Sequence, residues 1–215
     1  MSVMSPPSAI FRILYFKKSL HFNNYYRNIW CDNNHQGRRE YLEENIRRCA
    51  IFGQNAICFK WGFDEDEKQC CRMKRELLQK IMELRQQNVT QFFVACDYGV
   101  GLYAAEQIND LRKTDPDLML FCKLPHEGQA TKWAPYLRER YFKMLEDCTH
   151  IDCISLRAQP DAQLLAYQRI IDQSDLILTV FDSGASAAGP AEEKALAYAL
   201  VSRKPVLNLD PYTLA

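Results

Sequence analysis

The sequence predicts an α/β protein: a three-layer, doubly wound, Rossmann-like domain with a mostly parallel sheet of about six strands. Short apolar runs recur along the chain and are nearly continuous, as in strands covered on both faces. Segments of helical length separate them, and this alternation is typical of right-handed crossovers between parallel strands. The expected strands are 49–53, 91–96, 118–123, 151–155, 176–181 and 205–209.

The segments between these strands predict five helices. In the first, apolar residues recur along one side, and only Lys74 breaks the stripe. Asp161 follows a proline, and Glu192 and Glu193 follow another, at places where acidic residues favour the start of a helix. The expected helices are 68–87, 102–113, 130–147, 161–173 and 191–202.

The first 46 residues differ from the rest. They are rich in Asn and Tyr, include a Pro-Pro pair and show no long period. We expect residues 1–46 to be an N-terminal arm that is poorly ordered or loosely docked, or the product of a start assigned too early. Residues 47–215 then form the domain.

Composition narrows the classes of partner. Lys and Arg together number 27, as do Asp and Glu, so no global basic field draws the chain to nucleic acid. Nine cysteines without a CxxC pair argue against a zinc site or a disulfide framework and favour a reducing cytoplasm. No apolar run approaches the roughly 20 residues that cross a bilayer. We expect no cofactor, metal, nucleic acid or membrane partner, and a homo-oligomer is compatible with the fold.

Ligands of open parallel sheets bind beyond the carboxyl ends of the strands. This rule selects five loops: 53–64, 96–101, 124–133, 155–162 and 182–191. Polar or glycine residues of these loops and of the helix after the second loop are the candidate ligand-binding residues. They are Gly53, Gln54, Asp97, Gly99, Gly101, Glu106, Glu127, Gln129, Trp133, Asp182 and Gly189.

The loop after the second strand reads DYGVG. Gly99 and Gly101 leave backbone N–H groups free at the start of a helix, where an anion is favoured. Asp97 is a polar ligand anchor or, equally, a helix-capping carboxylate. A glycine pair of this kind is weak evidence by itself; its position between a strand and a helix adds to it.

The loop after the third strand, LPHEGQATKW, is the densest polar cluster. Glu127 is a weak candidate for a general base beside a ligand. The alternative is a surface helix cap with Trp133 in the core. The loop at Asp182 has the small residues of a phosphate cradle but lacks a Walker lysine, so it is not a P-loop.

These segments together resemble the YpsA-like family of the SLOG superfamily, a Rossmannoid group related to the DprA and lonely-guy proteins. The resemblance spans about 49–211 and is carried by CAIFGQ, WGFDEDEKQC, FFVACDYGVGLYAAE, LPHEGQATKW and IDQSDLILTVFD. It implies a Rossmannoid fold and binding of a nucleotide or nucleotide-derived ligand. Lonely-guy relatives hydrolyse nucleoside monophosphates, but the motifs here imply no such reaction.

The chain departs from the family pattern at polar loop residues. The usual T-G-H-R-P of the first loop is replaced by residues 52–56, FGQNA, without the His and Arg. In the second loop Gly101 stands where the family has a carboxylate. An R-N pair before the fifth strand is replaced by Ala166 and Tyr167, and a G-G-T before the last helix is absent. Losing charged donors weakens binding of an anion.

Three functions remain open. The first is a regulatory module that binds a nucleotide-like ligand weakly and without catalysis. The second is a hydrolase of an N-glycosidic or phosphoester bond, with Glu127 as base and Asp182 or Asp97 orienting water or ribose. The third is an interaction scaffold that uses the arm 1–46 and exposed aromatic side chains.

Overall fold

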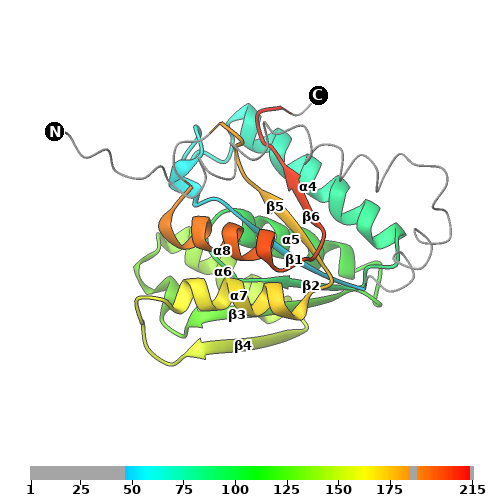
Figure 1. Ribbon diagram of the computed structural model, residues 1–215. Helices are drawn as coiled ribbons and strands as arrows, with labels where there is room; N and C mark the ends of the chain where they lie inside the picture. Colours follow the sequence, from blue (N-terminus) through cyan, green and yellow to red (C-terminus); the bar gives the residue numbers. More distant parts are fainter. Residues whose placement is uncertain (1–46, 185–187, 214–215) are drawn as a thin grey trace. The chain divides into compact units, whose positions relative to one another are not determined.

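The computed structural model describes residues 47–184 and 188–213, and the expected arm 1–46 lies outside them. Within these ranges six strands form one sheet, in the order β4-β3-β2-β1-β5-β6 (Figure 1). All five strand pairs are parallel. The strands are β1 (Arg48–Gly53), β2 (Gln91–Val94), β3 (Met119–His126), β4 (His150–Ser155), β5 (Leu176–Val180) and β6 (Val206–Leu209).

Helices cover both faces of the sheet. The helices α4, α5 and α6 lie on one face, and α7 and α8 pack together on the other (Figure 1). The three-layer, Rossmann-like fold expected from the sequence is therefore confirmed. The helices are α4 (Lys68–Gln86), α5 (Val100–Arg112), α6 (Pro135–Asp147), α7 (Ala162–Gln173) and α8 (Pro190–Val201).

The expected helix 130–147 is wrong at its start. Residues Gln129–Lys132 form a short 3-10 helix, η2, and α6 begins only at Pro135. Proline favours the first position of a helix, and it pushes the residue before it, Ala134, into an extended conformation. The third strand also runs on to His126, because β3 keeps pairing with β4 as far as Ser155.

The order in which successive strands are added to the sheet reverses at β1. The strands β1 to β4 follow one another outward, and α7 then returns the chain so that β5 pairs with the free side of β1. The carboxyl ends of β1 and β5 thus flank the position at which open α/β sheets bind ligands. The two loops are tied together there, since Gln54 N–H donates to the Val180 carbonyl at 3.0 Å.

Gly53 closes this part of the sheet tightly. A Cβ atom at Gly53 would lie 2.5 Å from Cγ2 of Val100 and 2.7 Å from the carbonyl oxygen of Val180. The backbone oxygen cannot move without breaking the sheet, so a side chain at this position is excluded. The absence of a Cβ lets α5 approach the carboxyl end of β1.

Gly53→Ala is expected to lower the free energy of unfolding by about 1–3 kcal/mol, the usual cost of overpacking a core. Chemical denaturation measures the change. Gly184→Ala is the matched control: its Cβ would meet only Oδ1 of Asp182, at 3.3 Å, and the expected change is within about 1 kcal/mol. Equal stability of the two variants would contradict the packing argument.

Candidate functional site

Two carboxyl groups lie buried at the reversal point. Asp97 follows β2 and is 9% exposed, and Glu192 lies in the first turn of α8 and is 4% exposed. Neutral side chains from two further elements surround Glu192. Asn55 Nδ2 and the Tyr167 hydroxyl each donate to Oε1 of Glu192, both at 3.3 Å. We call Asn55, Asp97, Tyr167 and Glu192 the acid cluster.

Local sequence explains why each member reaches this place. Asp97 lies in the short loop between β2 and α5, Asn55 is the second residue after β1, and Glu192 lies in the first turn of α8. Tyr167 is fully buried on α7, where its ring contacts Phe52 of β1 at a centroid distance of 5.3 Å. The sheet topology therefore collects side chains from four segments at one edge.

Burial shifts the acid–base balance of the cluster. It raises the pKa of Asp97 to about 7, and the nearby negative charge of Glu192 adds to the shift. Burial likewise raises the pKa of Glu192. The N–H groups of Asp97 and Gly101 and the Tyr167 hydroxyl act in the opposite sense on Asp97 without cancelling the shift. A carboxyl group with this pKa exchanges its proton near neutral pH.

Asp97 also has an unused acceptor. Its Oδ1 atom is buried and has no hydrogen-bond partner among the described residues. The residue before it, Cys96, has φ +54°, a left-handed conformation that is costly for a residue with a side chain. Unpaired buried acceptors and strained backbone gather at functional sites. Both observations coincide at two adjacent residues of this loop.

Glycines accommodate the two carboxylates. A Cβ atom at Gly101 would lie 2.5 Å from Oδ1 of Asp97. A Cβ atom at Gly189 would lie 2.3 Å from Oε2 of Glu192, and Gly189 has φ +103°. Gly99, with φ +109°, is the N-cap of α5. Gly101 and Gly189 therefore leave room for the carboxylates of the acid cluster, whereas a Cβ atom at Gly99 would meet Ala56 at 3.2 Å.

Two other expected residues hold the surrounding loops. Gln54 is fully buried; its Oε1 accepts from Asp182 N–H at 2.8 Å, and its Nε2 donates to the Cys58 carbonyl at 3.1 Å. Asp182 in turn accepts from Gly184 N–H at 2.7 Å. Gln54 thus joins the loops after β1 and β5. Part of the second loop, 185–187, lies outside the described residues.

The third loop contributes less to the cluster than the sequence suggests. Gln129 donates from Nε2 to the Cys96 carbonyl at 2.9 Å, which fixes the loop that carries Asp97. Trp133 is half-buried and packs edge-on against Tyr98 and Tyr141. Glu127 is exposed and makes no hydrogen bond with the described residues. It follows β3, which lies two strands from β1 in the sheet.

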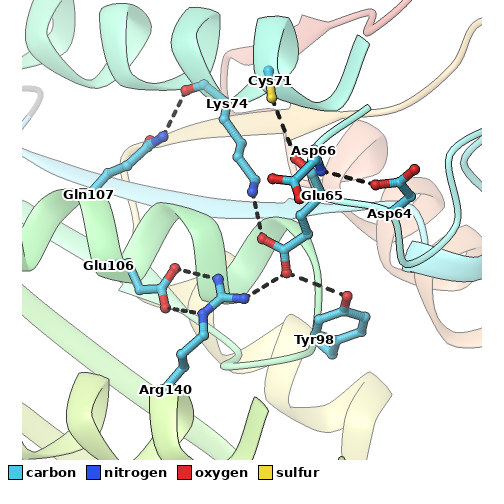
Figure 2. A network of polar contacts seen from close by, with 9 residues as sticks. All are labelled: Asp64, Glu65, Asp66, Cys71, Lys74, Tyr98, Glu106, Gln107 and Arg140. Atoms are coloured by element: carbon cyan, nitrogen blue, oxygen red, sulfur yellow. Dashed lines mark hydrogen bonds and ion pairs between the residues drawn. The ribbon is translucent and has the colours of Figure 1, made fainter. Parts of the chain in front are cut away.

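Glu106 belongs to a separate network of ion pairs, shown in Figure 2. Arg140 of α6 donates to both carboxylate oxygens of Glu106, at 2.8 and 2.7 Å, and to Glu65 at 2.6 Å. Glu65 also pairs with Lys74 of α4 at 2.5 Å. Although burial opposes it, pairing with Arg140 and Lys74 lowers the pKa of Glu65. The network ties the loop before α4 to α4, α5 and α6.

Sequence reasoning missed Tyr167, Asn55 and Glu192 as site residues. Glu192 has the pattern of an ordinary acidic residue at a helix start, and Tyr167 that of an apolar helix face. Their convergence depends on α7 crossing back over the sheet, which no local pattern shows. The sequence signals were the departures from the family pattern at Asn55 and at Tyr167.

The described residues include no group of three or more side chains arranged to hold a metal ion. None of their helices combines the length and apolar character needed to span a bilayer. Two hollows in the described surface lie elsewhere, one between α4 and β6 and one between α5 and α6. Neither is lined by a member of the acid cluster.

Comparison with known sequences places these features in a family. The YpsA model, described as the YspA SLOG family, matches residues 49–214, which confirms the resemblance expected from the sequence. A UPF0398 protein of Halalkalibacterium halodurans is 29% identical over 122 residues, 56% of this chain and 65% of that protein. UPF0398 proteins of Bacillus cereus (strain B4264) and Bacillus thuringiensis (strain Al Hakam) are each 30% identical over 112 residues, 51% of this chain and 61% of theirs. The match thus spans less than two thirds of these relatives' length.

Asp97→Asn is expected to flatten the pH dependence of stability. A raised pKa means that the folded protein binds the proton more tightly than the unfolded chain. Stability is therefore highest below the unfolded pKa and falls as the pH rises through about 7, by about 2–4 kcal/mol in total for this group. Denaturation of wild type and variant between about pH 4 and pH 8 measures this.

The amide keeps the shape of the carboxyl group and removes its titration, so Asp97→Asn gains stability relative to wild type as the pH rises. Asp161→Asn, at an exposed position, is the control and should follow the wild-type curve. Parallel curves for wild type and Asp97→Asn would contradict the raised pKa.

Arg140→Gln is expected to lower the free energy of unfolding by about 1–3 kcal/mol, because Glu65 and Glu106 lose their shared partner while partly buried. Lys143→Gln on the same helix removes an exposed pair with Asp147 and should cost under about 1 kcal/mol. Thermal unfolding compares the two variants. A larger loss for Lys143→Gln would overturn the assigned role of the network.

Proposed function

Because the chain belongs to the YspA SLOG family, we propose that it is a non-catalytic regulatory module that binds a nucleotide or nucleotide-derived ligand at the acid cluster. The observation that carries the proposal is Oδ1 of Asp97, a buried acceptor without a partner among the described residues. It lies at the point of the sheet where Rossmann-like domains bind such ligands. A donor hydroxyl of a ligand would satisfy it.

The polar groups of the cluster suit a ribose or base better than a reaction. Carboxylates and an amide at this edge of the sheet hydrogen-bond hydroxyl and amino groups. The hydrolase considered from the sequence needs Glu127 as a base close to the ligand. Its exposure, and its position after β3, favour a surface role instead.

Binding is expected to be weak. The family's His and Arg of the first loop are replaced by Gln54 and Asn55, of which Gln54 is used to join two loops. Lys123, a possible compensating cation, pairs with Asp152 at 2.7 Å instead. Each lost charge-assisted hydrogen bond weakens binding by about 1.5–3 kcal/mol. Regulation by a ligand at high cellular concentration is compatible with such weak binding.

A panel of nucleosides, nucleoside phosphates and ADP-ribose derivatives tests the proposal. We expect at least one compound to raise the melting temperature and to bind by calorimetry, with binding weakened about tenfold or more in Asp97→Ala. Glu127→Ala, which removes an exposed carboxylate of the same edge, should bind as wild type does. No binding by any compound, or loss of binding in Glu127→Ala alone, would refute the assigned site.

A further inference from the structure

The N-termini of α5 and α8 are each covered by a carboxylate of the chain itself. Oδ1 of Asp97 stands over the first turn of α5, 2.5 Å from where a Cβ of Gly101 would lie. Oε2 of Glu192 stands over the start of α8, 2.3 Å from where a Cβ of Gly189 would lie. In both helices a glycine provides the room that the carboxylate occupies.

A helix N-terminus attracts an anion because its first N–H groups have no partner within the helix. Here backbone N–H groups already face the carboxylates. The Gly101 N–H favours the ionised form of Asp97, and the N–H groups of Ala191 and Glu192 favour that of the Glu192 side chain. Each carboxylate therefore lies at a helix end where a bound phosphate would lie, and Oδ1 of Asp97 has no hydrogen-bond partner there among the described residues.

The two covered helix ends belong to one site. The negative charge of Glu192 is among the causes that raise the pKa of Asp97, so the carboxylates lie within electrostatic reach of each other. Their side-chain neighbours in the cluster, Asn55 and Tyr167, carry no positive charge. A dianionic phosphate arriving there meets negative charge at both helix ends.

Lys60 and Lys123, which could compensate for lost cationic donors, interact with other residues. The ammonium group of Lys60 lies 4.2 Å from the ring centroid of Tyr212. Lys123 is paired with Asp152. In the described part of the chain, these side chains do not offset the charge of the cluster. The unpaired Oδ1 of Asp97 is an acceptor, and it matches a hydrogen-bond donor rather than a phosphate oxygen.

We propose that Asp97 and Glu192 are built-in occupants of the two helix N-termini at this edge of the sheet, which exclude phosphate and leave the edge to an uncharged, hydroxyl-bearing ligand such as a nucleoside. The ligand class rests on the function proposed above, whereas the exclusion of phosphate does not. Ionised carboxylates close the helix ends. Protonation or removal of the carboxylates opens the ends to an anion.

Sulfate is the probe, because it is a tetrahedral dianion whose charge does not change between about pH 5.5 and pH 8. Calorimetry at constant ionic strength compares wild type with Glu192→Ala and with the double variant Asp97→Asn/Glu192→Gln. Glu192→Ala removes the charge and opens space, whereas the double variant removes charge and keeps shape. At pH 8 both variants are expected to bind sulfate about tenfold or more tightly than wild type.

The matched control is Glu127→Gln/Asp161→Asn, which removes two exposed carboxylates and should bind sulfate as weakly as wild type. Circular dichroism verifies that each variant is folded. Tight sulfate binding by wild type at pH 8, or no gain in the folded variants, would overturn the proposal. A gain of similar size in the control would overturn it too, because general charge would then explain the effect.

The pH dependence of sulfate binding by the wild type tests the proposal even if a variant fails to fold. Sulfate binding is expected to strengthen as the pH falls from about 8 to about 5.5, because the carboxyl groups become neutral. The titratable groups that face them are Glu193 of α8, Tyr167 of α7 and Cys58 of the short helix Ala56–Cys58. The double variant should lose most of this pH dependence. Binding independent of pH in wild type would overturn the proposal.

A last comparison separates this inference from the proposed function. For any nucleoside that binds, the uncharged form should bind wild type at least as tightly as its 5′-monophosphate does. A preference for the monophosphate would overturn the inference while supporting the function. If no nucleoside or nucleotide binds, the proposed function fails, and the sulfate measurements still decide whether the carboxylates close the helix ends.

Discussion

The pairing of β1 with strands on both of its sides is the constraint on which the domain depends. Because β1 pairs in parallel with β2 and with β5, the loops that follow all three strands begin at the same carboxyl edge of the sheet. Gly53 permits α5 to approach this edge, and Gln54 fastens the loops after β1 and β5 to each other. The acid cluster exists because these segments are held within hydrogen-bonding reach.

Most of the fold could be predicted because its signals are local. Each strand is a short apolar run, and all six observed strands begin within a residue of the expected position, although β2 ends earlier and β3 later than expected. The main error, the start of α6, came from reading η2 and α6 as one helix across Pro135. Pro135 places Ala134 in an extended conformation, which separates η2 from α6.

The site was predictable only in part, since it combines local and long-range features. Asp97, Gly99 and Gly101 occupy one loop, so their pattern is visible in the sequence. Glu192 and Tyr167 come from elements far along the chain that meet Asp97 only through the crossover of α7. Glu106 shows the opposite case. It lies close to the DYGVG loop in the sequence, but as a residue of α5 it pairs with Arg140 of α6.

The acid cluster weakens the fold in which it lies. Two buried carboxyl groups with raised pKa values destabilise the folded state at neutral pH, and neutral side chains of the same shape would not. The chain nevertheless supplies Asn55 and Tyr167 as donors to Glu192, and glycines where the carboxylates need room. A group that costs stability and has its surroundings shaped around it is more readily explained by binding than by folding. The departures from the family pattern therefore mark a changed ligand preference more naturally than a decayed site.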